Sequence, residues 1–213
     1  LIEGIIICCY AIKSHAAYIY IRGEYTSQVK ALQAAIDEAY AAGYLGESVD
    51  GHDFKLDVTV HRGAGAYVCG EETALLESIE GRKGQPRSKP PFPAVEGLYG
   101  CPTIINNVQS IASLPFILAN GPDAYKAYGT EKSPGTHLFG ISGLVKKPGM
   151  YELPLGLPIL EVIEKVAGGL RDGRNLKGII PGGSSTPVLT PEEAQDVTLD
   201  YESMAAHKTM FGS

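Results

Sequence analysis

"LDVTVHRGAGAYVCGEETALLESIEG", residues 56–81, decides the expected fold of the first part of the chain. It begins with alternating apolar and polar residues, which predict a strand, and ends with apolar residues at helical spacing, which predict a helix. A glycine-rich loop joins the two. The residues concerned are Leu56, Val58 and Val60 in the strand, Gly63, Gly65 and Gly70 in the loop, and Leu75, Leu76, Ile79 and Gly81 in the helix and at its end.

The residues before this stretch repeat the same pattern. Residues 3–12 are apolar and predict a buried helix, and residues 17–22 are β-branched and aromatic, which predicts a strand. From Val29 to Tyr40 apolar residues recur at helical spacing until Gly43 ends the helix. Strands separated by helices of this length predict a parallel sheet with helical crossovers, an α/β fold.

The residues after this stretch change in character. Residues 81–102 are rich in proline and glycine and predict a long irregular segment, which in a compact domain is usually functional. A helix is expected from about Asn106 to Ala119, followed by a short polar helix from Asp123 to Tyr128. The expected buried face of the longer helix consists of Val108, Ile111, Ala112 and Phe116.

A second domain is expected after a linker at residues 129–135. Residues 137–142 and 150–153 predict two strands of a hairpin, joined by a type II turn with Pro148 and Gly149 at its centre. A helix marked by Ile159 and Val166 and a third strand at residues 176–180 follow. Hairpin, helix and strand in this order are typical of a β-grasp domain. The predicted domains are therefore 1–133, α/β, and 134–213, β-grasp.

Composition excludes several classes of protein. The net charge of −6 leaves no basic field for a nucleic-acid partner. No apolar run reaches the roughly 20 residues that span a bilayer. Because the chain begins at Leu1 and ends abruptly at Ser213, we expect a fragment of a longer protein.

The four cysteines are expected to be reduced, mostly buried thiols of a cytosolic protein. Cys8 and Cys9 are adjacent, and a relaxed disulfide between neighbours is disfavoured. With Cys69 and Cys101 they form no CxxC motif and no Cys/His cluster, so a metal site built from these four is not expected.

Three segments could carry chemistry, and each has a simpler structural explanation. Glu71 and Glu72 would complement the dipole of the helix that they begin, at roughly 0.3–1 kcal/mol each. Phe92, held between prolines, could stack on a ring or cover the surface. Asn106 and Asn107 precede a helix: one asparagine is enough for an N-cap, and the second leaves a spare amide at a terminus suited to phosphate.

Together, in this order, these segments resemble the NADH-binding FMN flavoprotein subunit of respiratory complex I. The matching stretches are "YIYIRGEY", "HRGAGAYVCGEETALLESIEG", "PRSKPPFPAVEGLYG" and "PTIINNVQSIASLP", all between Tyr18 and Gly121. Residues 136–200 are similar to the β-grasp domain that follows in that family. The resemblance implies a Rossmann-like FMN- and NADH-binding domain followed by a ligand-binding β-grasp (SLBB) domain.

The resemblance also implies the residues of the site. Those expected to contact FMN are Gly70, Glu71, Glu72, Asn106, Asn107 and Ser110. Those expected to contact NADH are Glu71, Glu72, Phe92 and Tyr67. No side chain is expected to act as a catalytic acid or base, because hydride transfer belongs to the cofactor and the protein only positions the nicotinamide against it.

The function implied is oxidation of NADH by FMN, with electrons passed singly through iron–sulfur clusters toward quinone. A first glycine-rich loop and the cysteines of a [4Fe-4S] cluster lie outside these residues in that family, so this chain alone is expected to bind FMN weakly and to hold no cluster. The implied partners are other subunits of the complex, especially a [2Fe-2S] subunit. The implied location is cytoplasmic, peripheral to the inner membrane.

Two alternatives remain open. The equivalent flavin subunit of an NAD-linked hydrogenase or formate dehydrogenase shares the same motifs. A non-catalytic β-grasp scaffold with a degenerate flavin fold is the alternative of another class, and the intact Gly70-Glu71-Glu72 and Asn106-Asn107 segments argue against it.

Overall fold

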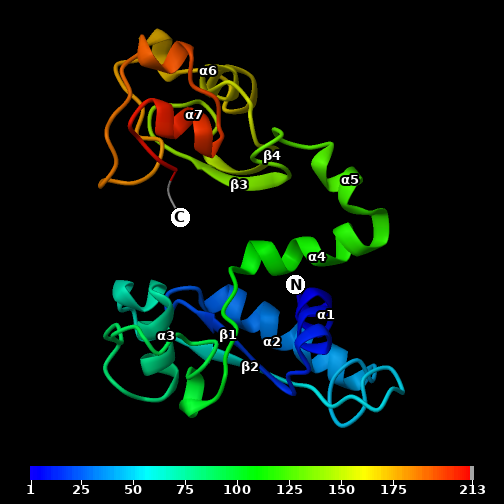
Figure 1. Ribbon diagram of the computed structural model, residues 1–213. Helices are drawn as coiled ribbons and strands as arrows, with labels where there is room; N and C mark the ends of the chain where they lie inside the picture. Colours follow the sequence, from blue (N-terminus) through cyan, green and yellow to red (C-terminus); the bar gives the residue numbers. More distant parts are fainter. Residues whose placement is uncertain (212–213) are drawn as a thin grey trace. The chain divides into compact units, whose positions relative to one another are not determined.

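The chain divides into two compact units, residues 1–115 and residues from Phe116 onward. The computed structural model describes residues 1–211. Figure 1 shows the first unit in blue to green and the second in green to red. Each unit has its own hydrophobic core, and each is described by itself.

The first unit follows the predicted order of helices and strands. The helices and strands are α1 (Ile2–Ile12), β1 (Ala16–Ile21), α2 (Thr26–Ala41), β2 (Asp57–Arg62), α3 (Glu72–Ile79) and α4 (Val108–Asn120), the last of which extends past Pro115. Short 3-10 turns occupy Tyr67–Gly70 and Leu98–Gly100. The predicted helix at residues 3–12, the two strands and the helix ending before Gly43 are confirmed to within three residues at each end.

The strands β1 and β2 pair in parallel, as predicted, with Ala16 opposite Asp57 and Ile21 opposite Arg62. Their carboxyl ends therefore meet at one edge of the sheet. The loops that follow them touch there, because a Cβ on Gly23 would lie 2.4 Å from the Gly63 carbonyl oxygen. Arg62 Nε donates to the Gly23 carbonyl oxygen at 2.8 Å. In open parallel sheets this edge is where ligands bind.

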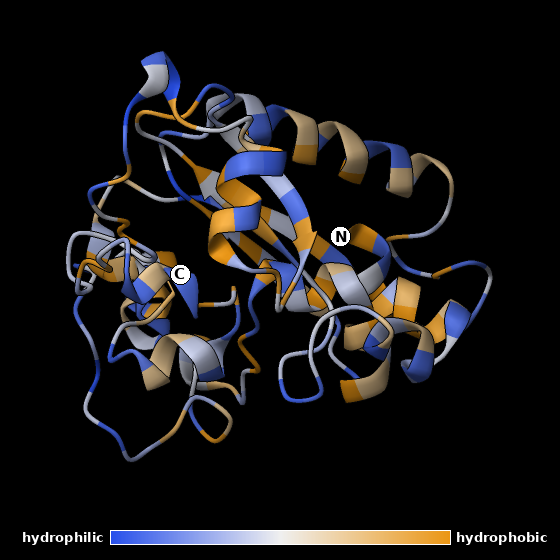
Figure 2. Ribbon diagram, turned by 90° about the horizontal axis from the view of Figure 1, so that it is seen from above, coloured by the Kyte–Doolittle hydropathy of each residue, from blue (hydrophilic) through white to orange (hydrophobic). Residues whose placement is uncertain are grey.

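The core of the first unit lies between α1, α2 and the sheet. Its buried members are Ile5, Cys9, Ile19, Ile36, Leu45, Val49, Phe54, Leu56 and Val58. Helix α1, which starts at the N-terminus in Figure 2, is largely coloured as hydrophobic. Gly4 on α1 allows close packing on α4, because a Cβ there would lie 2.0 Å from the Ile111 carbonyl oxygen.

The expected buried face of α4 is wrong. The exposed fraction is 52% at Val108 and 42% at Phe116, Ala112 is exposed, and only Ile111 packs against the core. The spacing of apolar residues shows which face of a helix is apolar, but it does not show what covers that face. Within residues 1–115, α1 reaches α4 at Ile111, and the two compact units divide within the helix itself.

The second unit contains an antiparallel hairpin and several short helices. They are α5 (Pro122–Lys126), β3 (Thr136–Ile141), β4 (Gly149–Pro154), α6 (Ile159–Glu161), a π-helical turn (Val162–Val166), 3-10 turns at Arg171–Gly173 and Glu193–Gln195, and α7 (Tyr201–Ala206). The hairpin pairs Thr136 with Pro154 and Ile141 with Gly149, as expected from the sequence. Its core contains Ile159, Val162, Leu189, Ala194, Val197, Leu199 and Met204.

Two predictions for this unit are wrong. The type II turn requires a positive φ at Gly149, but Gly149 begins β4 and the positive φ lies at Gly143. The register makes residues 142–148 a longer loop. The third strand at residues 176–180 is also absent from the described residues, where Ile179 forms only an isolated bridge with Leu189. A short apolar run predicts burial more reliably than it predicts a pairing partner.

The two compact units divide at Pro115, upstream of the domain boundary predicted near residue 133. A change in sequence composition and a division between compact units are different properties, so that boundary stays a prediction. Within residues 1–211 no helix is long and apolar enough to cross a membrane.

The cysteines differ in environment, which predicts different reactivity. Cys9 is buried, Cys69 is buried, Cys8 is half-buried and Cys101 is exposed, so the expectation of mostly buried thiols holds least well for Cys101. Burial, together with the neighbouring Cys8, raises the pKa of Cys9 to about 11.

We expect a maleimide to label Cys101 first and Cys9 last in the native protein. The raised pKa lowers the thiolate population of Cys9 about 100-fold at mildly alkaline pH, and only the thiolate reacts. Peptide mass spectrometry after timed labelling measures the order, with the denatured protein as the control in which all sites react. Labelling of Cys9 as fast as Cys101 in the folded protein would contradict the expected burial.

Candidate functional site

The N-terminus of α3 is closed by its own glutamate. Glu71 is the N-cap, and its Oε2 accepts hydrogen bonds from the backbone N–H groups of Thr73 and Ala74, each at 2.9 Å. Burial by itself raises the pKa of Glu71, but these hydrogen bonds, the Thr73 hydroxyl and Lys89 together hold the pKa below its ordinary value. An anion would find these N–H groups already occupied by a carboxylate.

Lys89 faces the glutamate pair from the irregular segment after α3. Its Nζ contacts Glu72 Oε1 and lies 3.5 Å from Glu71 Oε1. The hydrogen bond that Lys89 donates to Glu72, with the charge of Glu71 beside it, raises the pKa of Lys89. The three side chains are all partly exposed, at 30% for Lys89, 37% for Glu71 and 42% for Glu72. The net charge of the cluster is therefore −1, and its members remain accessible to a ligand.

Gly70 has open space where a side chain would be. A Cβ at this position would have nothing within 4 Å among the described residues, and the φ of Gly70 is not in the left-handed region. Neither backbone conformation nor internal packing therefore requires glycine here. By contrast, a Cβ on Gly63 would lie 2.5 Å from the Tyr20 hydroxyl, so that glycine is explained by packing.

Two aromatic side chains near this turn are exposed. Tyr67 is 92% exposed and Phe92 is 58% exposed. The backbone of Phe92 is fixed, because its carbonyl oxygen accepts hydrogen bonds from the N–H groups of Val95 at 2.8 Å and Glu96 at 3.0 Å. The ring of Phe92 is thus held on a rigid turn and presented to solvent, three residues after Lys89.

The N-terminus of α4 is different from that of α3. Asn107 Oδ1 accepts from the Gln109 N–H at 2.8 Å, which confirms the predicted asparagine cap. The Asn106 side chain has no hydrogen-bond partner among residues 1–211, and Ser110 is exposed one turn on. This terminus carries a neutral cap, a spare amide and a hydroxyl in place of a carboxylate. It can accept an anion.

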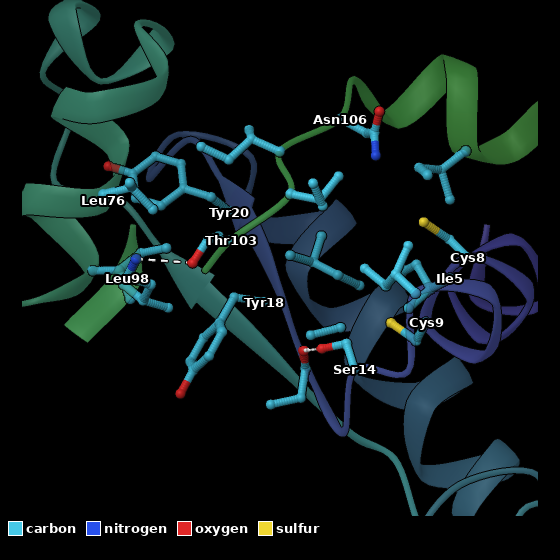
Figure 3. A pocket seen from close by; sticks show the side chains of 18 of the residues that line it. Ile5, Cys8, Cys9, Ser14, Tyr18, Tyr20, Leu76, Leu98, Thr103 and Asn106 are labelled. Atoms are coloured by element: carbon cyan, nitrogen blue, oxygen red, sulfur yellow. Dashed lines mark hydrogen bonds between the residues drawn. The ribbon is translucent and has the colours of Figure 1, made fainter. Parts of the chain in front are cut away.

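The largest cleft of the first unit has a volume of about 640 Å³ and is mostly apolar. Figure 3 shows Asn106 at its edge, on the segment leading into α4, with Cys8 and Ile5 from α1 and Tyr18 and Tyr20 from β1 around it. Of the predicted site residues, only Asn106 lines this cleft. Its walls offer few groups for a charged nucleotide, so the cleft alone does not define the site.

The structure groups the predicted site residues into two sets. Gly70, Glu71 and Glu72 lie together at the start of α3, with the segment of Phe92 fixed beside them through Lys89. Asn106, Asn107 and Ser110 lie at the start of α4. Within the described residues no hydrogen bond or ion pair joins the two sets, and Tyr67 has no such contact with either.

Sequence reasoning missed Lys89, Thr73 and Arg87. Lys89 stands in the quoted "PRSKPPFP" stretch, and a basic residue in an irregular segment after two adjacent glutamates was a usable signal. Nothing in the local pattern distinguishes Thr73 or Arg87, whose partners lie far away along the chain.

The parallel strands, the loops at their carboxyl ends and the open N-terminus of α4 define an α/β protein with a site suited to an anionic ligand. The comparisons with known proteins agree with this class. The chain belongs to the family described as the Nuo51 FMN-binding domain, which it matches over residues 1–115, and residues 137–207 match the SLBB domain.

Relatives with assigned names match the chain from end to end. A subunit of the NADH-quinone oxidoreductase of Mycobacterium bovis is 56% identical over 100% of this chain and 47% of its own length. The corresponding subunit of Streptomyces coelicolor is also 56% identical, over 47% of its length. NADH dehydrogenase [ubiquinone] flavoprotein 1 of Dictyostelium discoideum is 51% identical, over 45% of its length. The chain thus spans about half the length of these relatives.

A solved structure also matches. The NAD+-reducing [NiFe]-hydrogenase in the H2-reduced state is similar with a TM-score of 0.83 and 33% sequence identity, over 99% of this chain and 34% of that one. The same enzyme in the air-oxidised state gives a TM-score of 0.82.

Proposed function

We propose that the protein containing this chain oxidises NADH by hydride transfer to FMN, as one subunit of a multisubunit electron-transfer complex. The observation that carries the proposal is the contrast between the two helix N-termini. The terminus of α3 is closed by Glu71, whereas that of α4 keeps a spare amide at Asn106. A phosphate-bearing cofactor would be held at α4, and the glutamates at α3 would face a different ligand.

The residues present fit FMN. Asn106, Asn107 and Ser110 offer amide and hydroxyl donors at a helix N-terminus, which suit a phosphate group. The open space at Gly70 lets a flat ring approach the backbone where a Cβ would stand in the way. When bound, FMN supplies an acceptor that takes two electrons from NADH and releases them one at a time.

The residues around Glu72 fit NADH. The carboxylate of Glu72 is 42% exposed and accepts hydrogen bonds from hydroxyl or amide N–H donors, which the ribose and carboxamide of NADH carry. The exposed rings of Phe92 and Tyr67 can border a nucleotide. Lys89 lies where its charge can pair with the pyrophosphate after leaving Glu72. These residues orient the nicotinamide, and no acid or base is needed.

The Glu71–Glu72 pair also predicts a preference for NADH over NADPH. A 2′-phosphate near two carboxylates is repelled, and only one lysine compensates them. We expect Glu72→Gln to raise the ratio of kcat/KM for NADPH to that for NADH by about tenfold, since removing one charge relieves roughly 1.4 kcal/mol of repulsion. Steady-state kinetics with both donors and ferricyanide as acceptor measures this ratio. Glu47→Gln, which also removes a lysine-paired carboxylate, is the control. An unchanged ratio contradicts the assignment of Glu72.

The finer architecture and the partners belong to the same proposal. We infer that residues 134–213 form a β-grasp domain, supported by the hairpin and the SLBB match. The full-length protein is expected to hold a [4Fe-4S] cluster with ligands outside these 213 residues and to adjoin a [2Fe-2S] subunit at the cytoplasmic face of the membrane. The names of the relatives, which are subunits of NADH dehydrogenases, support this.

A second candidate is the flavin subunit of an NAD-linked hydrogenase. The observation in its favour is the 33% identity and TM-score of 0.83 to the NAD+-reducing [NiFe]-hydrogenase. The higher identity of 56% to subunits of NADH-quinone oxidoreductases favours the quinone-linked complex. Both candidates share the NADH–FMN reaction and differ only in the partner that takes or gives the electrons.

The proposal is tested with the full-length protein purified with FMN. NADH oxidation with ferricyanide measures the flavin reaction, and the same preparation is assayed with hydrogen and with a quinone in its native complex. NADH oxidation coupled to quinone supports the leading proposal, and coupling to hydrogen supports the second. A full-length protein that binds no FMN and oxidises no NADH leaves the non-catalytic scaffold as the correct interpretation.

A further inference from the structure

The segment after α3 has no helix or strand between Glu80 and Leu98, yet it carries Lys89 and Phe92. A segment of this kind keeps a fixed position only if side chains hold it. Two residues outside the set discussed above make those contacts, Thr73 on α3 and Arg87 in the segment itself.

Thr73 joins the glutamate cap to this segment. The residue is 1% exposed, and its hydroxyl uses both of its hydrogen-bonding roles. Oγ1 donates to Glu71 Oε2 and accepts from the backbone N–H of Arg87 at 2.8 Å. A buried hydroxyl with both roles satisfied is expensive to remove, because each partner would lose a hydrogen bond away from water. Thr73 therefore fixes the backbone of Arg87 relative to the carboxylate of Glu71.

The side chain of Arg87 fixes the rest of the segment. Its Nε donates to Glu77 Oε1 near the end of α3, and its Nη1 donates to the Gly97 carbonyl oxygen at 2.9 Å. Its Nη2 lies 2.8 Å from Glu80 Oε2, as an ion pair rather than a well-aligned hydrogen bond. The guanidinium group thus joins α3 to the far end of the segment. Its side chain is only 24% exposed.

We propose that Thr73 and Arg87 are positioning residues of the nucleotide site: they hold residues 87–92 against α3, so that Lys89 and Phe92 lie opposite Glu71 and Glu72. The inference rests on the proposed function for the identity of the nucleotide. Its geometric content, that Lys89 is placed by Thr73 and Arg87, does not depend on that identity.

The first test is kinetic and uses the full-length FMN-loaded protein. Thr73→Val keeps the shape of the side chain and removes the hydroxyl. We expect the KM for NADH to rise about tenfold, with kcat and flavin content within about twofold of the wild type, the size expected for one hydrogen bond to a charged group. Thr73→Ser restores the hydroxyl and is expected to restore the KM. An unchanged KM in Thr73→Val, or a Thr73→Ser variant as defective as Thr73→Val, overturns the proposal.

Arg87→Lys provides the second variant, because lysine keeps the charge but cannot donate to three partners with a planar group. Arg82→Lys is the matched control. Arg82 also contacts Glu77 and Glu80, but its side chain is 59% exposed, and exposed pairs contribute little. We expect Arg87→Lys to raise the KM as Thr73→Val does and Arg82→Lys to leave it unchanged. Equal effects of the two lysine variants overturn the assignment of Arg87.

A further measurement needs no cofactor and no activity. The rate at which an amine-reactive acetylating reagent modifies Lys89, followed by peptide mass spectrometry, reports whether Lys89 is held on the glutamates. We expect at least about a threefold faster modification in Thr73→Val and in Arg87→Lys than in the wild type, with an unchanged rate at the distant Lys55. Unchanged modification of Lys89 overturns the proposal. Failure of the proposed function gives a different result, a wild-type protein without NADH oxidation.

Discussion

Replacing Asn106 and Asn107 together by alanine is expected to lower the affinity of the full-length protein for FMN by at least about 100-fold. Each asparagine offers a hydrogen bond to the phosphate group, and a hydrogen bond to a charged group contributes about 1.5–3 kcal/mol. Two such bonds amount to about 3–6 kcal/mol, which exceeds a factor of 100 in the dissociation constant. Flavin fluorescence during equilibrium dialysis measures the affinity.

Two further variants separate binding from folding. Asn107 also caps α4, so its loss alone destabilises the helix by about 1 kcal/mol. Asn107→Asp keeps the cap but adds a negative charge, so we expect it to fold normally and still to lose FMN. Asn120→Ala removes an asparagine at the other end of α4, where its Nδ2 donates to the Phe116 carbonyl oxygen, and is expected to keep FMN. Retention of FMN by both the double variant and Asn107→Asp would refute the phosphate assignment.

Gly70→Ala is expected to leave the stability of the fold unchanged and to weaken FMN binding about 10- to 100-fold. The added methyl group has nothing within 4 Å in the chain, and the φ of Gly70 suits alanine. If the flavin ring packs against this turn, however, the methyl group occupies its space, and forcing an extra methyl into a packed site costs about 1–3 kcal/mol. Thermal unfolding without FMN and FMN titration measure the two effects separately.

Gly183→Ala is the matched control for this change. It also adds a methyl group with nothing within 4 Å and has no positive φ, but it lies in the second unit. It is expected to change neither stability nor FMN binding. If Gly70→Ala binds FMN as tightly as Gly183→Ala does, the ring does not approach the backbone at Gly70.

Much of the fold followed from local patterns. The alternation at Leu56, Val58 and Val60 and the apolar face at Leu76 and Ile79 are set by which residues face a core, and the structure has both as predicted. The tertiary pairing within the second unit did not follow. Ile179 forms a single bridge because what it pairs with is decided by distant residues, which a short apolar run does not encode.

The site was predicted less completely than the fold. The asparagine cap at Asn107 was correct, because capping is a local interaction. The two glutamates were expected to act alike, but Glu71 caps its own helix while Glu72 contacts Lys89. Glutamate is not among the residues favoured at an N-cap, so this division of roles had no local signal. The Thr73–Arg87 contact joins residues 14 positions apart through a segment without regular structure.

The central claim is that these residues belong to a site where NADH reduces FMN. An anaerobic titration of the FMN-loaded full-length protein with NADH tests it most directly, with the bleaching of the flavin absorbance as the measured quantity. We predict complete bleaching once NADH equals the total of electron pairs that FMN and any bound clusters accept, and much slower bleaching with NADPH. Flavin that is bleached by dithionite but stays oxidised with excess NADH would contradict this claim.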